Sequence, residues 1–238
     1  MTTPLTLVPG NDSDRSDRLA ELLEETSPQA RLARLEATTR PVLPALASLL
    51  PGGRLPRGVA IEVLGDRYLL MALATGAAQD PTVRTALVGL GDLGLSAYES
   101  MGQDLRQLAV VDTPGPHWAE VVSLLAREGA FGVILLQPTT PATPRQVQRL
   151  HARLREEGTT LLVTSPWRGA ALRLTTSDQA ISGVKDGWGA VHSRTVTAHC
   201  TTGTRTRSLR LQLPGADGTV QPLAATETAT RPADAATA

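Results

Sequence analysis

A glycine turn between a predicted strand and a predicted helix is the place where this chain could bind a phosphate group. The run Val59 to Leu64 is mostly apolar and rich in β-branched residues, which is typical of a buried strand. Gly65 ends that run, and the Leu- and Ala-rich segment Tyr68 to Ala78 favours a helix. Amides in the first turn of a helix bind anions, so this order of elements is the setting of a phosphate-binding loop.

The loop needed for nucleotide binding is missing from this turn. Such a loop has the pattern G-x-x-x-x-G-K-[ST], whose amides surround the phosphates, whose lysine reaches them and whose hydroxyl holds magnesium. Here Gly65 is followed directly by Asp66, Arg67 and Tyr68, and the single lysine of the chain is Lys185. Asp66 also places a negative charge where an anion would bind. We therefore predict no nucleotide cofactor at this degenerate position.

The other reactive side chains lack partners at catalytic spacing. The histidines are not spaced as metal ligands to one another: His117, His151, His192 and His199. Ser165 lies outside a G-x-S-x-G pattern. A single cysteine, Cys200, excludes an internal disulfide and a multi-cysteine metal site, and its place on the apolar side of a predicted strand favours packing. We predict no metal site and no catalytic residue.

Tryptophan and arginine side chains are the candidates for a protein interface. Aromatic residues make up 3% of the chain, and Trp and Arg are enriched at the centres of interfaces. The candidate interface residues are Trp118, Trp167, Trp188, Arg194, Arg205 and Arg207. The tryptophans could instead be packed inside the fold, and the arginines of the trailing segment could be solvated or meet DNA phosphates. A solvated face is the preferred interpretation for a second group, Arg145, Arg149, Arg153 and Arg155.

Alternating apolar and helical segments predict an α/β fold with a mostly parallel sheet flanked by helices. The predicted strands are Val59 to Leu64, Thr85 to Leu90, Leu108 to Val111, Gly132 to Leu136 and Thr160 to Thr164. The predicted helices are Tyr68 to Ala78, Leu95 to Met101, Trp118 to Glu128 and Pro144 to Glu157. After Pro166 the segments Leu172 to Thr175, Trp188 to Cys200 and Arg207 to Leu213 favour a trailing antiparallel β-hairpin.

The two ends of the chain differ in composition from its centre. Residues 1–14 are rich in Thr, Pro, Gly and Asp, and we predict that they are disordered. Residues 15–50 are predicted to form an N-terminal helical arm whose last helix runs from Pro41 to Leu50. Residues 51–214 form the predicted core, and residues 215–238 form a predicted flexible tail.

Four stretches of the sequence, taken in the order in which they occur, resemble the RecA recombinase family. They are LPGGRLPRGVAIEVLG, GDLGLSAYESMGQDLRQLAVVD, GAFGVILLQP and RLREEGTTLLVTSPW, and the likeness covers roughly Leu49 to Pro214. Within that family the chain looks most like the ImuA branch of mutagenic-repair accessory proteins and its actinobacterial ImuA-prime form. The resemblance implies a RecA-like core, with an N-terminal arm that helps subunits associate or that packs on its own domain.

The resemblance also implies two further catalytic positions, and neither holds the residue that ATP hydrolysis requires. A glutamate that activates water should follow Thr85 to Leu90, but the nearest acid is Asp92, for which a turn or helix-capping role is preferred. The run Gly132 to Leu136 should end in a magnesium-binding aspartate, but Gln137 follows, and its amide is a poor ligand for a hard cation. Because electrostatic stabilisation carries most of the catalysis in this class, we predict a RecA-like fold without ATPase activity.

Charge and hydropathy exclude some classes of partner. The 238 residues contain 23 basic and 23 acidic side chains, so composition gives no electrostatic signal of nucleic-acid binding. The apolar runs are far shorter than the roughly 20 residues that span a bilayer, and the first residues lack the pattern of a secretory signal. We expect a cytoplasmic protein that does not contact the membrane.

The resemblance implies a non-catalytic adaptor in SOS-induced error-prone translesion synthesis, as part of a mutasome. Its implied partner is an ImuB-type inactive Y-family polymerase, and through it an error-prone C-family polymerase and the sliding clamp. Two alternatives stay open: a DNA-binding RecA paralogue that modulates recombination or repair without ATP hydrolysis, and an SOS cell-division inhibitor. The predicted regions of partner contact are the N-terminal helical arm and the trailing hairpin or tail.

Overall fold

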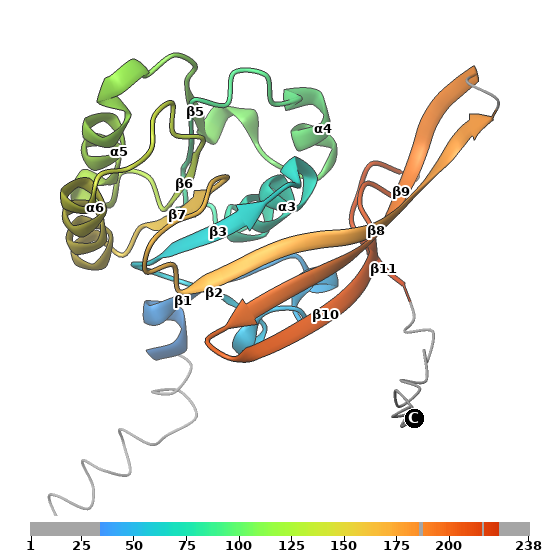
Figure 1. Ribbon diagram of the computed structural model, residues 1–238, viewed down its shortest axis with the longest axis horizontal. Helices are drawn as coiled ribbons and strands as arrows, with labels where there is room; N and C mark the ends of the chain where they lie inside the picture. The colour runs from blue at the N-terminus through green and yellow to red at the C-terminus, as the bar shows by residue number, and fades with distance from the viewer. Residues whose placement is uncertain (1–33, 186–187, 216, 224–238) are drawn as a thin grey trace, which may run out of the picture. The chain divides into compact units, whose positions relative to one another are not determined.

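A computed structural model describes residues 34–185, 188–215 and 217–223 of the chain (Figure 1). The chain divides into two compact units, residues 1–39 and residues 40–238. The first unit is described from residue 34 onward, and residues 34–38 are helical. The predicted disordered residues 1–14, most of the predicted arm and most of the predicted tail therefore lie outside the described residues.

In the described part of the chain, nine strands form one sheet in the order β11-β10-β9-β8-β3-β7-β6-β4-β5. The parallel strands at its centre are β3 (Ala60–Leu64), β4 (Thr85–Val88), β5 (Leu108–Val111), β6 (Val133–Leu136) and β7 (Thr160–Val163). Strand β8 (Leu172–Lys185) pairs in parallel with β3 and antiparallel with β9 (Trp188–Thr202). A separate two-stranded sheet consists of β1 (Thr39–Arg40) and β2 (Leu55–Pro56). The predicted α/β class with a mostly parallel sheet is confirmed.

Helices connect the parallel strands, as the sequence pattern predicts. They are α3 (Arg67–Ala77), α4 (Leu95–Ser100), α5 (Trp118–Ala126) and α6 (Pro144–Glu157). Short 3-10 turns lie at η1 (Pro44–Leu46), η2 (Pro51–Gly53), η3 (Leu105–Gln107), η4 (Gly115–His117) and η5 (Arg127–Gly129). Helix α6 has strong local signals at both ends. Thr143 and Gln146 form a capping box at its start, and Gly158 adopts a left-handed conformation with φ of 64° at its end.

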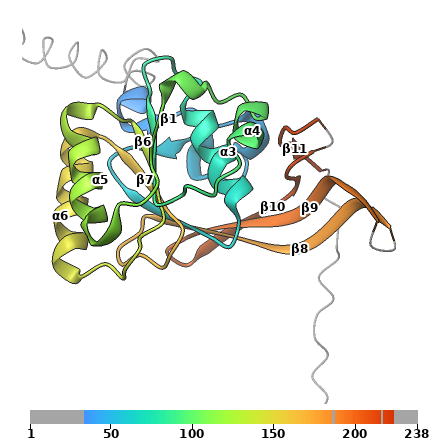
Figure 2. The ribbon, with the colours of Figure 1, turned by 90° about the horizontal axis from the view of Figure 1, so that it is seen from above.

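Two apolar layers cover the two faces of the parallel strands. Successive side chains of a strand point to opposite faces, so Val133 and Leu135 of β6 join one core while Ile134 and Leu136 join the other. Helix α3 and the leucines of residues 46–55 pack in the first core, and α5 and α6 pack in the second. Figure 2 shows α3 on one side of β6 and β7, and α5 and α6 on the other.

The trailing strands extend the sheet in antiparallel fashion through β9, β10 (Arg205–Gln212) and β11 (Gln221–Pro222). Val196, Ala198 and Cys200 of β9 are buried on the core face, as their alternation with polar residues predicts. Strand β8 pairs with β3 as far as Thr175, and β10 pairs with β9 as far as Thr195. Beyond these points β8 and β9 pair with each other as a ribbon that projects from the sheet (Figures 1 and 2).

Two predicted elements differ from the structure. The segment from Pro41 to Leu50 was expected to be a helix, but it contains the 3-10 turn η1 instead. Pro41 and Pro44 both lack an amide proton, which disfavours a continuous helix. Strand β8 is also much longer than the predicted Leu172 to Thr175, because the polar and glycine residues of its second half hide the strand pattern.

Candidate functional site

The carboxyl ends of β3, β4 and β6 bring together the residues that a nucleotide site would use. Asp66 follows β3, Asp92 follows β4 and Gln137 follows β6. Residues at the carboxyl ends of parallel strands meet at one edge of the sheet, which is where α/β proteins usually bind ligands. The structure thus gathers the positions that the sequence singled out as degenerate.

Asp66 is the N-cap of helix α3. Its side-chain Oδ1 accepts a hydrogen bond of 3.0 Å from the backbone amide of Leu69. Gly65 turns the chain into this cap with φ of 77°. The free amides of the first helical turn form the part of a phosphate-binding loop that attracts an anion. Here a carboxylate of the chain itself takes that role.

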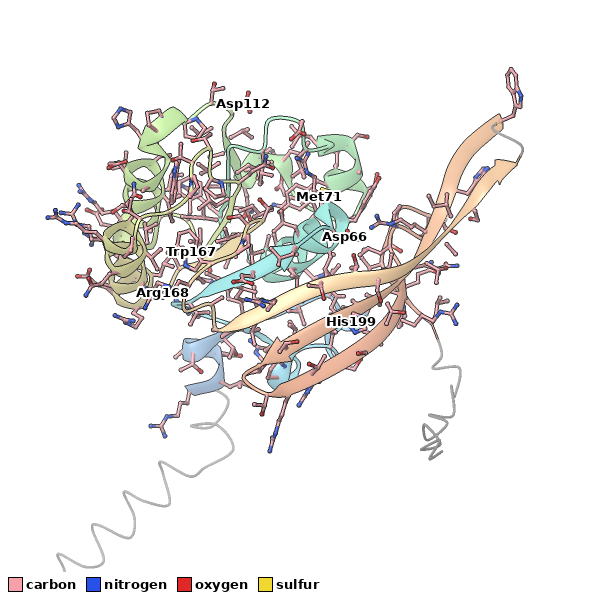
Figure 3. The ribbon with its side chains drawn as sticks, viewed as in Figure 1. Asp66, Met71, Asp112, Trp167, Arg168 and His199 are labelled. Carbon is pink, nitrogen blue, oxygen red and sulfur yellow. The ribbon has the colours of Figure 1, made fainter. Side chains whose placement is uncertain are left out.

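Arg194 from β9 pairs with this buried carboxylate. Asp66 is fully buried in its side chain, and its Oδ2 accepts hydrogen bonds from Nη2 of Arg194 and, at 3.2 Å, from Oγ1 of Thr176. The Arg194 guanidinium also lies 5.3 Å from the ring centroid of Tyr68, and its Nε donates to the carbonyl of Leu213 at 3.0 Å. A buried carboxylate needs such a partner, because an unpaired charge in the interior is costly. Figure 3 shows Asp66 at the start of α3, beside the trailing strands.

Arg67 bridges the other two strand ends. Its Nη2 donates to Oε1 of Gln137 at 3.1 Å, and its Nη1 forms an ion pair with Oδ2 of Asp92. The hydrogen bond from Arg67 lowers the pKa of Asp92 below its usual value. Asp92 lies in a turn, as the sequence favoured, and its carboxylate is there the ion-pair partner of Arg67. The guanidinium of Arg67 is thus engaged by two side chains of the protein.

Glu62 is a second buried acid, and it lies inside strand β3. Its Oε1 accepts a 2.6 Å hydrogen bond from the backbone amide of Trp167, and its carboxylate pairs with Arg173 of β8. This contact raises the pKa of Arg173. The pair fastens the loop after β7 and the first trailing strand to the centre of the sheet.

The three tryptophans occupy different environments. Trp118 and Trp167 are buried, with exposed fractions of 0% and 3%, and their rings meet edge to face at 6.1 Å between centroids. Nε1 of Trp118 donates to Thr140 Oγ1, and Nε1 of Trp167 donates to His151 Nε2. These two candidate interface residues are therefore core residues, because their rings fill the layer under α5 and α6. Trp188, at the start of β9, is 84% exposed.

The candidate arginines also occupy different environments. Arg194 points inward to Asp66, so its expected place on the surface of the hairpin is wrong. Nη1 of Arg207 donates to the carbonyl of Leu50 at 3.0 Å, and this bond ties β10 to the segment before β2. Arg205 is exposed. On α6, Arg153 pairs with Glu156 and Glu157, whereas Arg145, Arg149 and Arg155 are exposed.

The remaining reactive residues have structural partners. His199 lies on the outer face of the trailing sheet (Figure 3), where Ser177 and Ser208 hydrogen-bond its two ring nitrogens. Cys200 is buried, and burial raises the pKa of its thiol. Within the described ranges, no cluster of three His, Cys, Asp or Glu side chains is placed to hold a metal ion. In the same ranges, no helix is long and apolar enough to cross a membrane.

Sequence reasoning missed the two ion pairs in which a buried acid of this site meets an arginine of the trailing strands. The partners of each pair are 111 and 128 residues apart, so spacing could not connect them. One signal was present, because Glu62 interrupts an otherwise apolar strand, and a charged residue in a buried strand needs a partner.

In comparisons with known proteins, the segment that matches a known family contains the parallel strands β3 to β7. The sequence model of the family described as the MT3502 N-terminal domain matches residues 48–169 of the 238. The chain is also 36% identical over 129 residues to the uncharacterized protein Rv3395c from Mycobacterium tuberculosis. That alignment covers 53% of this chain and 62% of the relative, so less than two thirds of the relative's length is matched.

Proposed function

The chain belongs to the MT3502 N-terminal domain family, and we propose that it is a non-catalytic adaptor with a RecA-like core that acts in SOS-induced error-prone translesion synthesis. Its proposed partner is an ImuB-type inactive Y-family polymerase. Through that partner it would meet an error-prone C-family polymerase and the sliding clamp. This role would place the protein in the cytoplasm.

The observation that carries the proposal is the occupied anion position at the start of α3. Asp66 caps the helix and is neutralised by Arg194, while Arg67 is held by Asp92 and Gln137. A nucleotide phosphate would have to approach a carboxylate and displace contacts that the protein already satisfies. Phosphoryl transfer depends on cations placed around the transferring group, and this edge of the sheet supplies none that is free of a protein partner among the residues described.

The arrangement of the strands supports the RecA-like part of the proposal. A parallel sheet whose helices cover both faces is followed by an antiparallel ribbon, which is the order that the resemblance implies. A fold of this kind can serve as a docking surface when its chemistry is lost, because function depends on the site rather than on the fold.

The projecting β8–β9 ribbon supports the adaptor part of the proposal. Ile181 and Trp188 are 57% and 84% exposed on this ribbon. Tryptophan is favoured at the energetic centre of interfaces, and large exposed apolar side chains mark contact surfaces. We therefore propose that Trp188 enters an apolar pocket of the polymerase-like partner.

The test is co-expression with the ImuB-type protein of the same genome, followed by affinity purification of one partner. We expect a stable complex that survives gel filtration, and we expect Trp188→Ser to weaken it at least tenfold. Arg106→Ser is the matched control, because Arg106 is also highly exposed but lies far along the chain, beside β5. Failure of the wild-type chain to co-purify would count against the adaptor role.

The same preparation tests the absence of catalysis. We expect no magnesium-dependent ATP turnover from the purified chain or from the complex. Turnover that disappears in Arg67→Ala would contradict the proposal, because it would show that Arg67 serves a nucleotide rather than Asp92 and Gln137.

A further inference from the structure

A groove between helices α5 and α6 combines an exposed leucine with unpaired arginines. The groove has a volume of about 310 Å³ and takes its floor from Ala119 and Leu150. Both floor residues are buried, with exposed fractions of 6% and 2%. Leu124 lines the groove and is 63% exposed, which is the most exposed aliphatic side chain among the large hydrophobic residues described.

The rim of this groove is basic. Arg127 and Arg149 line it, and Glu120 is the acidic side chain that lines it with them. No acidic residue in the described part of the chain forms an ion pair with Arg127 or Arg149. Arg153, on the same helix as Arg149, does pair with Glu156 and Glu157. Two exposed arginines therefore flank an apolar patch that the described residues leave uncovered.

We propose that the α5–α6 groove docks a short acidic amphipathic helix of a partner protein. Its apolar side chains would lie against Leu124 and over Ala119 and Leu150, and its carboxylates would pair with Arg127 and Arg149. Helices dock in such grooves through apolar residues at spacings of three and four. This inference is independent of the translesion-synthesis role, because it depends on the groove and not on the degenerate nucleotide position or on Trp188.

The apolar floor favours a peptide over a nucleic-acid backbone. Phosphate contacts need cations and hydrogen-bond donors, and they gain nothing from an exposed leucine between two helices. An acidic helix satisfies both features of the groove at once. The groove is small compared with a standard protein interface, so we expect micromolar affinity.

Peptide display gives a direct test of the occupant's chemistry. A phage library of random 16-residue peptides would be selected on the full chain, and the enriched peptides would be synthesised with a fluorescent label. We expect enriched sequences with Leu, Ile or Phe at helical spacing and with a net negative charge. Fluorescence anisotropy would then measure binding to the wild-type chain and to Leu124→Glu and Arg149→Glu, whose altered side chains are exposed and leave the core intact.

Matched controls separate the groove from other surfaces. Arg155→Glu reverses a charge on the same helix outside the groove, and Trp188→Ser removes the exposed ring of the β8–β9 ribbon. We expect at least a tenfold loss of affinity for both groove variants and less than a twofold change for both controls. A peptide with lysine in place of its acidic contacts should recover binding to Arg149→Glu.

Three results would overturn the proposal. The first is a selection that enriches no peptide or enriches basic ones. The second is acidic peptides whose affinity is unchanged by Leu124→Glu and Arg149→Glu. The third is salt-dependent binding of single-stranded oligonucleotides that Arg149→Glu abolishes and Leu124→Glu leaves intact, because the groove would then be part of a nucleic-acid surface.

Discussion

Two ion pairs join the trailing strands of the sheet to its parallel strand β3. Asp66 and Glu62 lie at or inside the end of β3, and each meets an arginine supplied by the trailing strands. Both acids are buried, so each depends on its partner. The same contact that fills the anion position at α3 therefore also holds β9 in place.

The Asp66–Arg194 pair gives a prediction about stability. Arg194→Met should lower the free energy of unfolding by about 3–5 kcal/mol, because it leaves a buried carboxylate unpaired. Asp66→Asn combined with Arg194→Met should lose clearly less than Arg194→Met alone, because asparagine still caps α3 and carries no charge. Urea unfolding followed by circular dichroism measures both changes.

An exposed ion pair provides the comparison for that prediction. Arg106 and Asp104 pair at 3.0 Å with side chains that are 89% and 38% exposed. Arg106→Met should change the free energy of unfolding far less than Arg194→Met, because surface pairs contribute little. If Arg194→Met costs no more than this control, the Asp66–Arg194 pair does not stabilise the fold as we infer.

Helix α3 packs closely against the segment around Val42 and Leu43, which precedes β3 in the chain. A Cβ atom on Gly76 would lie 2.3 Å from the backbone nitrogen of Leu43 and 2.6 Å from the Cα of Val42. Glycine inside a helix normally costs about 1 kcal/mol relative to alanine. At this position glycine permits the close approach of residues 42–43 to α3. These residues belong to the segment from Pro41 to Leu50, which the sequence predicted to be a helix of its own.

Gly76→Ala should therefore destabilise the protein although it favours the helix. We expect a loss of about 1–3 kcal/mol, because the new methyl group meets backbone atoms that cannot rotate away. Gly94→Ala is the control, since its Cβ would make an ordinary contact of 3.8 Å and should cost less than about 1 kcal/mol. Thermal and urea unfolding measure the change, and a stabilised Gly76→Ala variant would contradict the close contact.

Local signals explain which elements the sequence could predict. The bounds predicted for β5 and α6 agree with the structure, because Leu108–Val111 is a continuous apolar run and α6 has a capping box and a terminal glycine. The pairs Glu62–Arg173 and Asp66–Arg194 could not be predicted, because they depend on how the trailing strands align with β3. Burial of Trp118 and Trp167 likewise depends on two separate helices and a loop meeting over the sheet.

Two exposed surfaces lie far apart on the second unit of the chain. Both ribbon views place α5 and α6 at one end of the sheet and the end of the β8–β9 ribbon at the other (Figures 1 and 2). The parallel strands between them are covered on both faces, and at their carboxyl ends Asp66 and Arg67 form ion pairs with other side chains of the protein. Such separated surfaces would allow one molecule to contact two partners at once, which the proposed adaptor role requires.

The ribbon gives a prediction that separates folding from partner binding. Residues 182–193 would be replaced by Asn-Gly, which favours a two-residue hairpin turn and leaves Ile181 opposite Arg194. The described cross-strand pairs that are removed join residues of the deleted segment to one another. We therefore expect the free energy of unfolding to change by less than about 1 kcal/mol, since surface changes away from the core are small.

The same variant should lose the proposed ImuB-type partner, because it lacks Trp188. Circular dichroism and urea unfolding measure its stability, and affinity purification from the co-expression strain measures the complex. A shortened chain that is stable and still co-purifies would show that the partner binds elsewhere. A shortened chain that unfolds would show that the ribbon supports the core, although an isolated two-stranded ribbon adds little stability in water.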